Sequence, residues 1–269
     1  MTKLTRLKGC GLGLQRRRAR ATLRVLLLWF AAAGFAQACS SVEPDHAAWS
    51  ALLSRRVLDG RVDYAGLLRE DQSALDGYLA TLSGTCAEDY AGWSRAEKLA
   101  FWINAYNAFT VRLILDHYPL RSIRNIGWLP GAAFRMPFIP MAGLRGEEMS
   151  LDDIEHRVLR AEFAEPRIHF ALVCAARSCP PLRAEAYRAA ALDQQLDDQG
   201  RRFLGDHAKN HADQAAGKLY LSAIFKWFRP DFETNGPLGS FVAPYLELQA
   251  GDIVNFEIEF LAYDWSLNE

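Results

Sequence analysis

The chain has 269 residues, half of them hydrophobic, which suffices for one well-buried core or at most two small domains. The formal net charge of −1 is unevenly distributed, because residues 1–38 carry eight Lys and Arg and no acid. Taking these eight from the 31 basic residues leaves 23 against 32 acidic ones, a charge near −9 for the remainder. Phosphate backbones repel a domain of that charge, so we do not expect nucleic-acid binding.

The first 38 residues have the three parts of an export signal. Residues 16–20 are basic, residues 25–33 are apolar but short for a permanent membrane span, and Ala36-Gln37-Ala38 fits a cleavage site. Cys39 follows at once, which fits a lipid-modified N-terminus, while plain secretion and an uncleaved anchor stay open. We predict a signal peptide over 1–38, a tether over 39–46 and an exported domain over 47–269. This domain would be periplasmic, secreted or tethered, and would meet a membrane only through the leader or a lipid on Cys39.

The first half of the predicted domain is helical. Apolar residues at helix spacing follow Ala47, a short extended piece covers 62–64, and a further helix ends at Gly84. The longest helix begins at Ser94, which forms a capping box with Glu97, and stops before Pro119. Its apolar residues cover nearly the whole circumference, so we expect it to be the axis of the core.

The second half mixes helices and strands. Pro and Gly between 134 and 149 predict an irregular β-hairpin, and Ser150 with Asp153 caps a helix through Arg160. The continuous apolar run 168–174 predicts a strand buried on both faces. Further predictions are a helix over 184–204, a strand over 218–221, a helix over 236–246 and a strand over 254–263. No linker divides the chain. We therefore predict an α+β fold, a single mixed domain with a central apolar helix packed against a small sheet.

Four ordered segments carry a family resemblance. They are residues 101–108 (FWINAYNA), residues 151–160 (LDDIEHRVLR), residues 167–182 with Ser178-Cys179-Pro180-Pro181-Leu182 at their end, and residues 221–232 with Asp231-Phe232. Together they resemble the domain of unknown function 547 family over most of 47–269. This family has no assigned activity and occurs in exported bacterial proteins and in plant proteins. The resemblance also implies a distant similarity to thiol-hydrolase or transglutaminase-like folds, a weak analogy because fold does not fix chemistry.

Asn104 and Asn107 are three residues apart and so share one face of the longest helix. A buried amide without partners costs about 1–3 kcal/mol, so both side chains need hydrogen bonds. In one interpretation they tie neighbouring loops to the helix. In the other, one of them donates to a substrate carbonyl or oxyanion, and Asn104 is the better candidate for this role.

Three residues in and after the run 168–174 can carry chemistry. His169 is either a neutral core histidine or a base, and on a strand it faces away from Cys174. Cys179 reaches His169 if the intervening residues turn the chain back, and Arg177 would then lower the pKa of the Cys179 thiol. The competing interpretations are a Cys174–Cys179 disulfide and an inert buried thiol.

Glu155 and His156 lie on the helix that Ser150 caps. Acidic residues one turn before and Arg160 one turn after predict a solvated face of salt bridges. Adjacent helical residues point about 100° apart, so this pair is a poor metal site. We predict no metal and no cofactor.

Two hypotheses for the function follow. In the first, the domain is an envelope thiol hydrolase or acyl-transferase with Cys179 as nucleophile, His169 as base, Glu155 orienting the histidine and Asn104 donating to the oxyanion. In the second, it is a non-catalytic binding or scaffold domain with a structural Cys174–Cys179 disulfide. In both cases we expect a small-molecule or peptide ligand.

Overall fold

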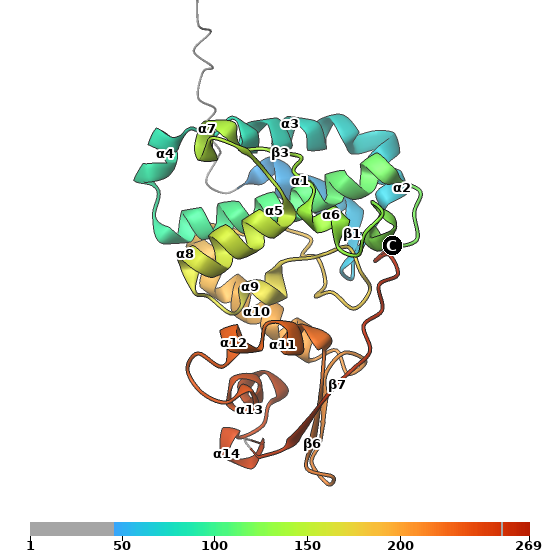
Figure 1. The fold of residues 1–269 in the computed structure, drawn as a ribbon, viewed down its shortest axis with the longest axis vertical. Helices are drawn as coiled ribbons and strands as arrows, with labels where there is room; N and C mark the ends of the chain where they lie inside the picture. Colours follow the sequence, from blue (N-terminus) through green and yellow to red (C-terminus); the bar gives the residue numbers. More distant parts are fainter. Residues whose placement is uncertain (1–45, 254) are drawn as a thin grey trace, which may run out of the picture. The chain divides into compact units, whose positions relative to one another are not determined.

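The computed structural model describes residues 46–253 and 255–269, so the predicted leader, Cys39 and nearly all of the predicted tether lie outside the described part. Helices and short strands form an α+β single domain, which confirms the predicted fold class (Figure 1). None of the helices described is long and apolar enough to span a membrane.

The described chain opens with helices around a small hairpin. The helices are α1 (Ala47–Arg56), α2 (Tyr64–Gly66), the π-helical η1 (Leu67–Asp71), α3 (Gln72–Ser83) and α4 (Ala87–Gly92). Between α1 and α2, strands β1 (Val57–Leu58) and β2 (Arg61–Val62) pair antiparallel. Buried apolar side chains of α1 and α3 face the central helix within one hydrophobic cluster.

The central helix α5 (Arg95–His117) is the predicted longest helix, and its capping box between Ser94 and Glu97 is confirmed. Every residue from Leu99 to Leu115 is buried except Arg112, as expected of a helix wrapped on all sides. The helix ends because Tyr118, which precedes a proline, is extended. Its main neighbours are helices, among them α3 and η3.

A short hairpin and a capped helix follow, as predicted. After η2 (Ile123–Asn125) and α6 (Ala132–Arg135), strands β3 (Ile139–Pro140) and β4 (Glu148–Met149) pair antiparallel around α7 (Ala142–Arg145). Ser150 Oγ then accepts a hydrogen bond from the Asp153 amide, and the Asp153 carboxylate accepts from Ser150. The capped helix is π-helical over η3 (Asp153–Arg160) and continues as α8 (Ala161–Phe163).

The predicted strand over 168–174 is wrong. Residues Ile168–Ala171 form one helical turn, α9, and only Leu172 begins an extended stretch. Amides of Ile168 and His169 bond to carbonyls of the preceding turn at Glu165 and Pro166. A continuous apolar run is compatible with either structure when all its neighbours are buried, so its hydrophobicity could not decide between them.

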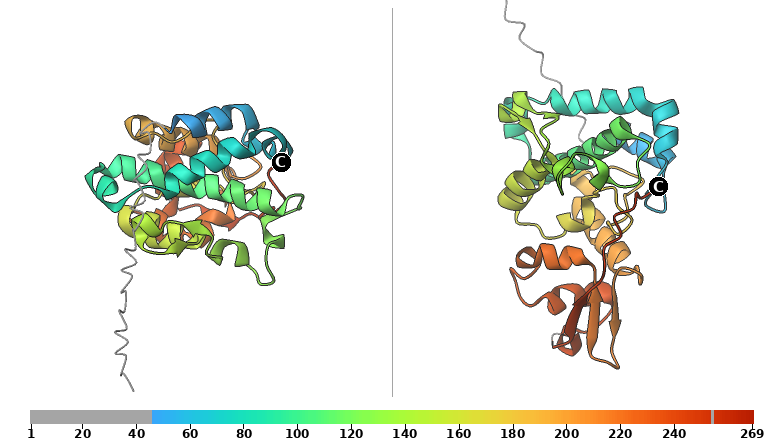
Figure 2. Two further views of the ribbon diagram at one scale, coloured as in Figure 1. Left: turned by 90° about the horizontal axis from the view of Figure 1, so that it is seen from above. Right: turned by 45° about the vertical axis from the view of Figure 1, so that its right-hand side comes forward.

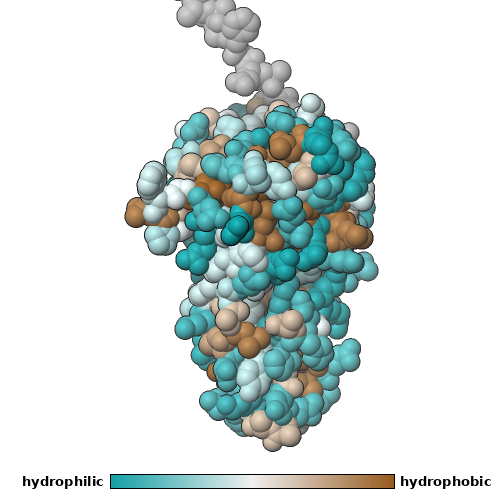
Figure 3. Space-filling model, turned by 90° about the vertical axis from the view of Figure 1, so that its right-hand side faces the viewer, coloured by the Kyte–Doolittle hydropathy of each residue, from teal (hydrophilic) through white to brown (hydrophobic). Residues whose placement is uncertain are grey.

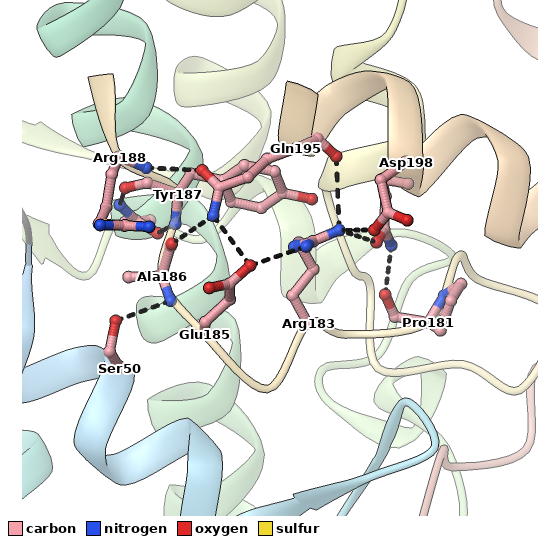
Figure 4. A network of polar contacts seen from close by, with 11 residues as sticks. Ser50, Pro181, Arg183, Glu185, Ala186, Tyr187, Arg188, Gln195 and Asp198 are labelled. Carbon is pink, nitrogen blue, oxygen red and sulfur yellow. Dashed lines mark hydrogen bonds and ion pairs between the residues drawn. The ribbon is translucent and has the colours of Figure 1, made fainter. Parts of the chain in front are cut away.

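The predicted helix over 184–204 is right only for its second half. After the 3-10 turn η4 (Ala189–Ala191), the helix α10 covers Leu192–Leu204. Before it the chain is irregular, because side chains of other elements bond its backbone (Figure 4). The amides of Ala186, Tyr187 and Arg188 donate to Ser50, Asn104 and Gln195 respectively. A backbone bonded in this way cannot close helical turns.

The three-stranded sheet belongs to a second hydrophobic cluster. In space this cluster lies at the end of the domain opposite to α3 (Figures 1 and 2). Strand β6 (Lys218–Leu221) lies between β5 (His211–Asp213), which is antiparallel to it, and β7 (Glu257–Phe260), which is parallel. The predicted strand over 218–221 is thus confirmed, and the one predicted over 254–263 is found over 257–260. The helices around the sheet are α11 (Ala223–Trp227), α12 (Arg229–Phe232), α13 (Leu238–Val242), η5 (Ala243–Leu246) and α14 (Ala250–Ile253), and α13 with η5 confirms the helix over 236–246.

After β7 the last residues run back along the first cluster (Figure 1). Ala176 forms an isolated antiparallel bridge with Leu267, and the Asn268 amide donates to the Ala175 carbonyl. This places residues 261–269 against the loop that carries both cysteines. On the face shown in Figure 3, hydrophobic patches lie among hydrophilic residues. Large apolar side chains exposed in the described part of the chain include Trp128, Leu129 and Trp227.

Candidate functional site

A cavity of about 170 Å³ lies where six stretches of chain meet. They are α5, α6, the start of η3, residues 169–180, the region of α11, and the C-terminal segment that follows β7. Its aromatic lining is Tyr106, Phe134, Trp227, Phe228, Tyr263 and Trp265, and its titratable lining is Asp152, Glu155, His156 and His169, with Cys174 and Cys179. The predicted catalytic residues Cys179, His169 and Glu155 therefore line one cavity. Among the described residues, no group of three or more metal-ligating side chains is placed to hold an ion.

His169 is held by a carboxylate that the sequence analysis did not assign. Its Nε2 lies 2.8 Å from Asp231 Oδ2, and its ring stacks on Phe228 with 3.9 Å between centroids. Burial would raise the pKa of Asp231, but hydrogen bonds from Arg160 and His169 outweigh burial and hold that pKa well below its usual range. An ionised Asp231 can only accept, so Nε2 carries the proton and Nδ1 keeps its lone pair. Burial lowers the pKa of His169, which favours this neutral form.

Arg160 fixes Asp231 in turn. Its Nε and one terminal nitrogen contact the two Asp231 oxygens at 2.6 and 2.8 Å, a bidentate pair. The other terminal nitrogen lies 3.1 Å from Nδ1 of His156. Burial lowers the pKa of His156, so this ring accepts from the guanidinium as a neutral imidazole. The solvated salt-bridge face predicted for this helix is wrong for Glu155, which is nearly buried, and for Arg160, which pairs with Asp231 of α12. This pair fixes the carboxylate that orients the imidazole of His169.

Glu155 faces the other nitrogen of His169. Its Oε1 lies 3.7 Å from His169 Nδ1, and its side chain is only 12% exposed. Burial, helped by the charge of Asp152, raises the pKa of Glu155 to about 7. A carboxyl group with such a pKa can give or take a proton near neutral pH. Glu155 is therefore placed to exchange a proton with His169 or a ligand, whereas Asp231 orients the ring.

Cys174 and Cys179 form a disulfide, as in the second hypothesis. The helical turn α9 overturns the strand argument that separated Cys174 from His169, since both line the cavity. The Tyr263 hydroxyl lies 3.2 Å from the Cys179 sulfur and 3.3 Å from that of Cys174. The Cys174 amide donates to the Cys179 sulfur over 3.0 Å. Cys179 is buried, whereas Cys174 is partly exposed.

Asn104 and Asn107 have the structural role that one interpretation predicted. Asn104 donates to the Tyr187 carbonyl and accepts from the amide of the same residue. Asn107 donates to the Ala171 carbonyl and accepts from the Val173 amide. Both side-chain amides thus form their hydrogen bonds with the backbone of neighbouring loops, and neither residue lines the cavity. The pairing of Asn107 with 171–173 ties the His169 turn to the central helix.

Arg177 does not occupy the place predicted for it. Its side chain is exposed and it does not line the cavity. Its charge instead contributes to a lowered pKa of Asp264. The cation closest to the Cys179 backbone is on Lys209, whose ammonium donates to the Cys179 carbonyl over 2.9 Å.

Sequence reasoning missed Asp231, which contacts His169 but does not line the cavity, and two lining residues, Tyr263 and Trp265. Asp231 stood in a quoted family segment without a role, and its distance of 62 residues from His169 gave no local signal. Tyr263 lies in a predicted strand, where an aromatic residue is expected in any case. Trp265 could be found only from its place in the fold, which a sequence does not state.

The fold and the cavity define an α+β domain with a buried histidine–carboxylate pair beside a disulfide. Residues 90–204 match the family model described as protein of unknown function, DUF547, which confirms the resemblance over this part of the chain. The matched segment contains Glu155, His169 and both cysteines, whereas Asp231 and Tyr263 lie beyond it. No curated protein and no solved structure matches the chain.

Proposed function

We propose that the protein is an exported envelope enzyme, a cysteine-dependent hydrolase or acyl-transferase acting on a small-molecule or peptide substrate. The observation that carries the proposal is the convergence of Cys179, His169 and Glu155 on one cavity. A nucleophile, a base and a second proton-transfer group in one cavity, with Asp231 orienting the base, are the usual components of acyl transfer through a covalent intermediate.

In this proposal the nucleophile is released by reduction. An external dithiol attacks the more exposed Cys174 sulfur, the S–S bond breaks, and Cys179 leaves as a thiolate while the dithiol is oxidised. The donors already aimed at the Cys179 sulfur, the Cys174 amide and the Tyr263 hydroxyl, stabilise this thiolate. Cys179 is therefore the better leaving group and the better nucleophile of the pair.

The acyl step then uses the groups around the sulfur. The thiolate attacks a substrate carbonyl, the carbonyl carbon becomes bonded to sulfur, and the leaving group departs with a proton. That proton comes from Glu155, whose pKa burial raises to about 7, while burial lowers the pKa of His169 and leaves its ring a neutral base. Water or another acceptor attacks the thioester, returns a proton to Glu155 and regenerates the thiolate.

The test is acylation of a variant whose bridge cannot form. C174S removes the bridge partner of Cys179, and C179S is the matched control that retains the other thiol. With p-nitrophenyl acetate, we expect a burst of nitrophenolate and an acetyl group on Cys179 by mass spectrometry for C174S. We expect neither for C179S or for oxidised wild-type protein. The variant H169A should slow acylation of C174S about 100-fold. Acylation of C174S no faster than that of a free cysteine would refute the proposal.

A second candidate is the non-catalytic binding or scaffold domain, favoured by the disulfide itself. The bridge joins residues five positions apart. Closing such a loop lowers the conformational entropy of the unfolded chain and so stabilises the folded protein by about 2 kcal/mol. If the role is structural, C174S and C179S should lose this stability equally, and neither should be acylated. Export is tested separately by cell fractionation of the full chain, with C39S released from membranes if Cys39 carries lipid.

A further inference from the structure

Two carboxyl groups in the cavity have no partner that neutralises them. Within residues 46–253 and 255–269, neither Asp152 nor Glu155 accepts a side-chain hydrogen bond, and the only close ionisable contact of Glu155 is His169 at 3.7 Å. The nearby cations are engaged elsewhere. Arg160 is paired with Asp231, and Arg135 donates to the Pro130 carbonyl. A buried carboxylate needs hydrogen-bond donors, so donors from a ligand or from water must complete this end of the cavity.

Another part of the cavity lining is aromatic. The rings of Trp227, Tyr263 and Trp265 form one group, with centroids 4.7 to 5.8 Å apart. Trp227 remains 46% exposed, although an indole of this size is usually covered. Trp265 already accepts a cation, since the Arg124 guanidinium lies 5.4 Å from its ring centroid. Aromatic faces attract organic cations, and they do so most strongly where water is excluded.

We infer that the cavity binds a primary alkylammonium group, with Glu155 and Asp152 accepting its N–H donors and the Trp227–Tyr263–Trp265 wall covering its alkyl chain. This names the substrate class for the same cavity and rests on the proposed function only in treating the ligand as a substrate. A primary ammonium suits these groups because its three donors match free carboxylate oxygens. The cavity lining, in the part of the chain that the structure describes, has two carboxyl groups and no Lys or Arg, which disfavours an anionic ligand.

Binding is tested on oxidised wild-type protein, in which the bridge prevents any reaction of Cys179. Tryptophan fluorescence reports on Trp227 and Trp265, and n-butylammonium chloride is titrated at pH 8 beside n-butanol, its neutral counterpart. We expect n-butylammonium to bind at least tenfold more tightly. E155Q and D152N should each weaken n-butylammonium at least tenfold and leave n-butanol unchanged. E148Q, which alters an exposed carboxylate outside the cavity, should change neither.

Several outcomes would overturn the inference. Equal affinity for n-butanol would mean that only the apolar wall binds. Unchanged ammonium affinity in both E155Q and D152N would place the cation elsewhere. Equal affinity for tetramethylammonium, which lacks N–H donors, would contradict the choice of a primary ammonium. Binding is measured with the disulfide intact. If C174S is not acylated, the proposed function is therefore refuted, while the binding result remains valid.

Discussion

Replacing Glu155 with glutamine should stabilise the protein at alkaline pH and hardly change it at acidic pH. Burial, with the charge of Asp152, raises the pKa of Glu155 from 4.5 to about 7. Between these two values the folded chain keeps a proton that the unfolded chain has lost, so stability falls as the pH rises through this window. With about 1.4 kcal/mol per pKa unit, the loss between pH 5 and pH 8 amounts to about 2 to 3 kcal/mol.

Urea denaturation of wild-type protein and E155Q at both pH values, without reductant, measures this loss. Glutamine resembles the protonated carboxyl group, so E155Q should match wild type at pH 5 and exceed it by about 2 kcal/mol at pH 8. The difference between the two proteins isolates Glu155 from the other groups that titrate in this range. E148Q is the matched control and should show the same small difference at both pH values. An equal gain for E155Q at pH 5 and pH 8 would refute the reasoning, because it would mean that Glu155 is not held protonated by burial.

Three further changes test the contacts around the cavity. Asp231→Asn breaks the bidentate pair with Arg160 and should lower the free energy of unfolding by about 2 to 3 kcal/mol at pH 7. Because the pKa of Asp231 is depressed in the folded state, this loss should become smaller as the pH falls below about 4, which urea unfolding measures. Asn107→Ala leaves two buried backbone groups without partners and should cost about 2 to 4 kcal/mol, whereas Asn125→Ala, on an exposed turn, should leave the unfolding midpoint unchanged. Ser94→Ala removes the cap of α5 and should cost about 1 kcal/mol in thermal unfolding.

The elements that the sequence predicts correctly are those with local signals. Helix α5 follows from its capping box and an apolar pattern without gaps, and η3 follows from the Ser150–Asp153 cap. The segment 168–174 lacks such a signal, because a run of buried apolar residues has neither the period of a helix nor that of a strand. Its structure is decided by contacts from α5, through Asn107, which lies more than 60 residues earlier.

In the candidate site, too, local signals identify some residues, whereas contacts from distant segments cannot be predicted from the sequence. Chemistry-bearing residue types identify Cys179, His169 and Glu155, and these three do line one cavity. The partners that set their properties come from distant segments, Asp231 for the imidazole and Tyr263 for the sulfurs, 62 and 84 residues away. Arg177 was assigned from its nearness in sequence alone, and its exposed position shows how little neighbouring positions in a loop constrain side-chain direction.

Because ionised Glu155 lowers stability and would bind the cation, a bound ammonium should restore part of the stability that the ionisation of Glu155 costs. The groups that share its surroundings are Asp152 and Arg160 on its own helix, and Tyr106, His169, Asp231 and Tyr263 from other elements. Arg160 is held by Asp231, so the net field at Glu155 is negative and a cation relieves it. At ten times its dissociation constant, n-butylammonium should stabilise wild-type protein by about 1.4 kcal/mol at pH 8. It should stabilise less at pH 5, where Glu155 is protonated, and E155Q should respond equally weakly at both pH values. Thermal unfolding with and without the amine measures these shifts, and an equal shift for wild type and E155Q at pH 8 would break the link between the buried charge and the ligand.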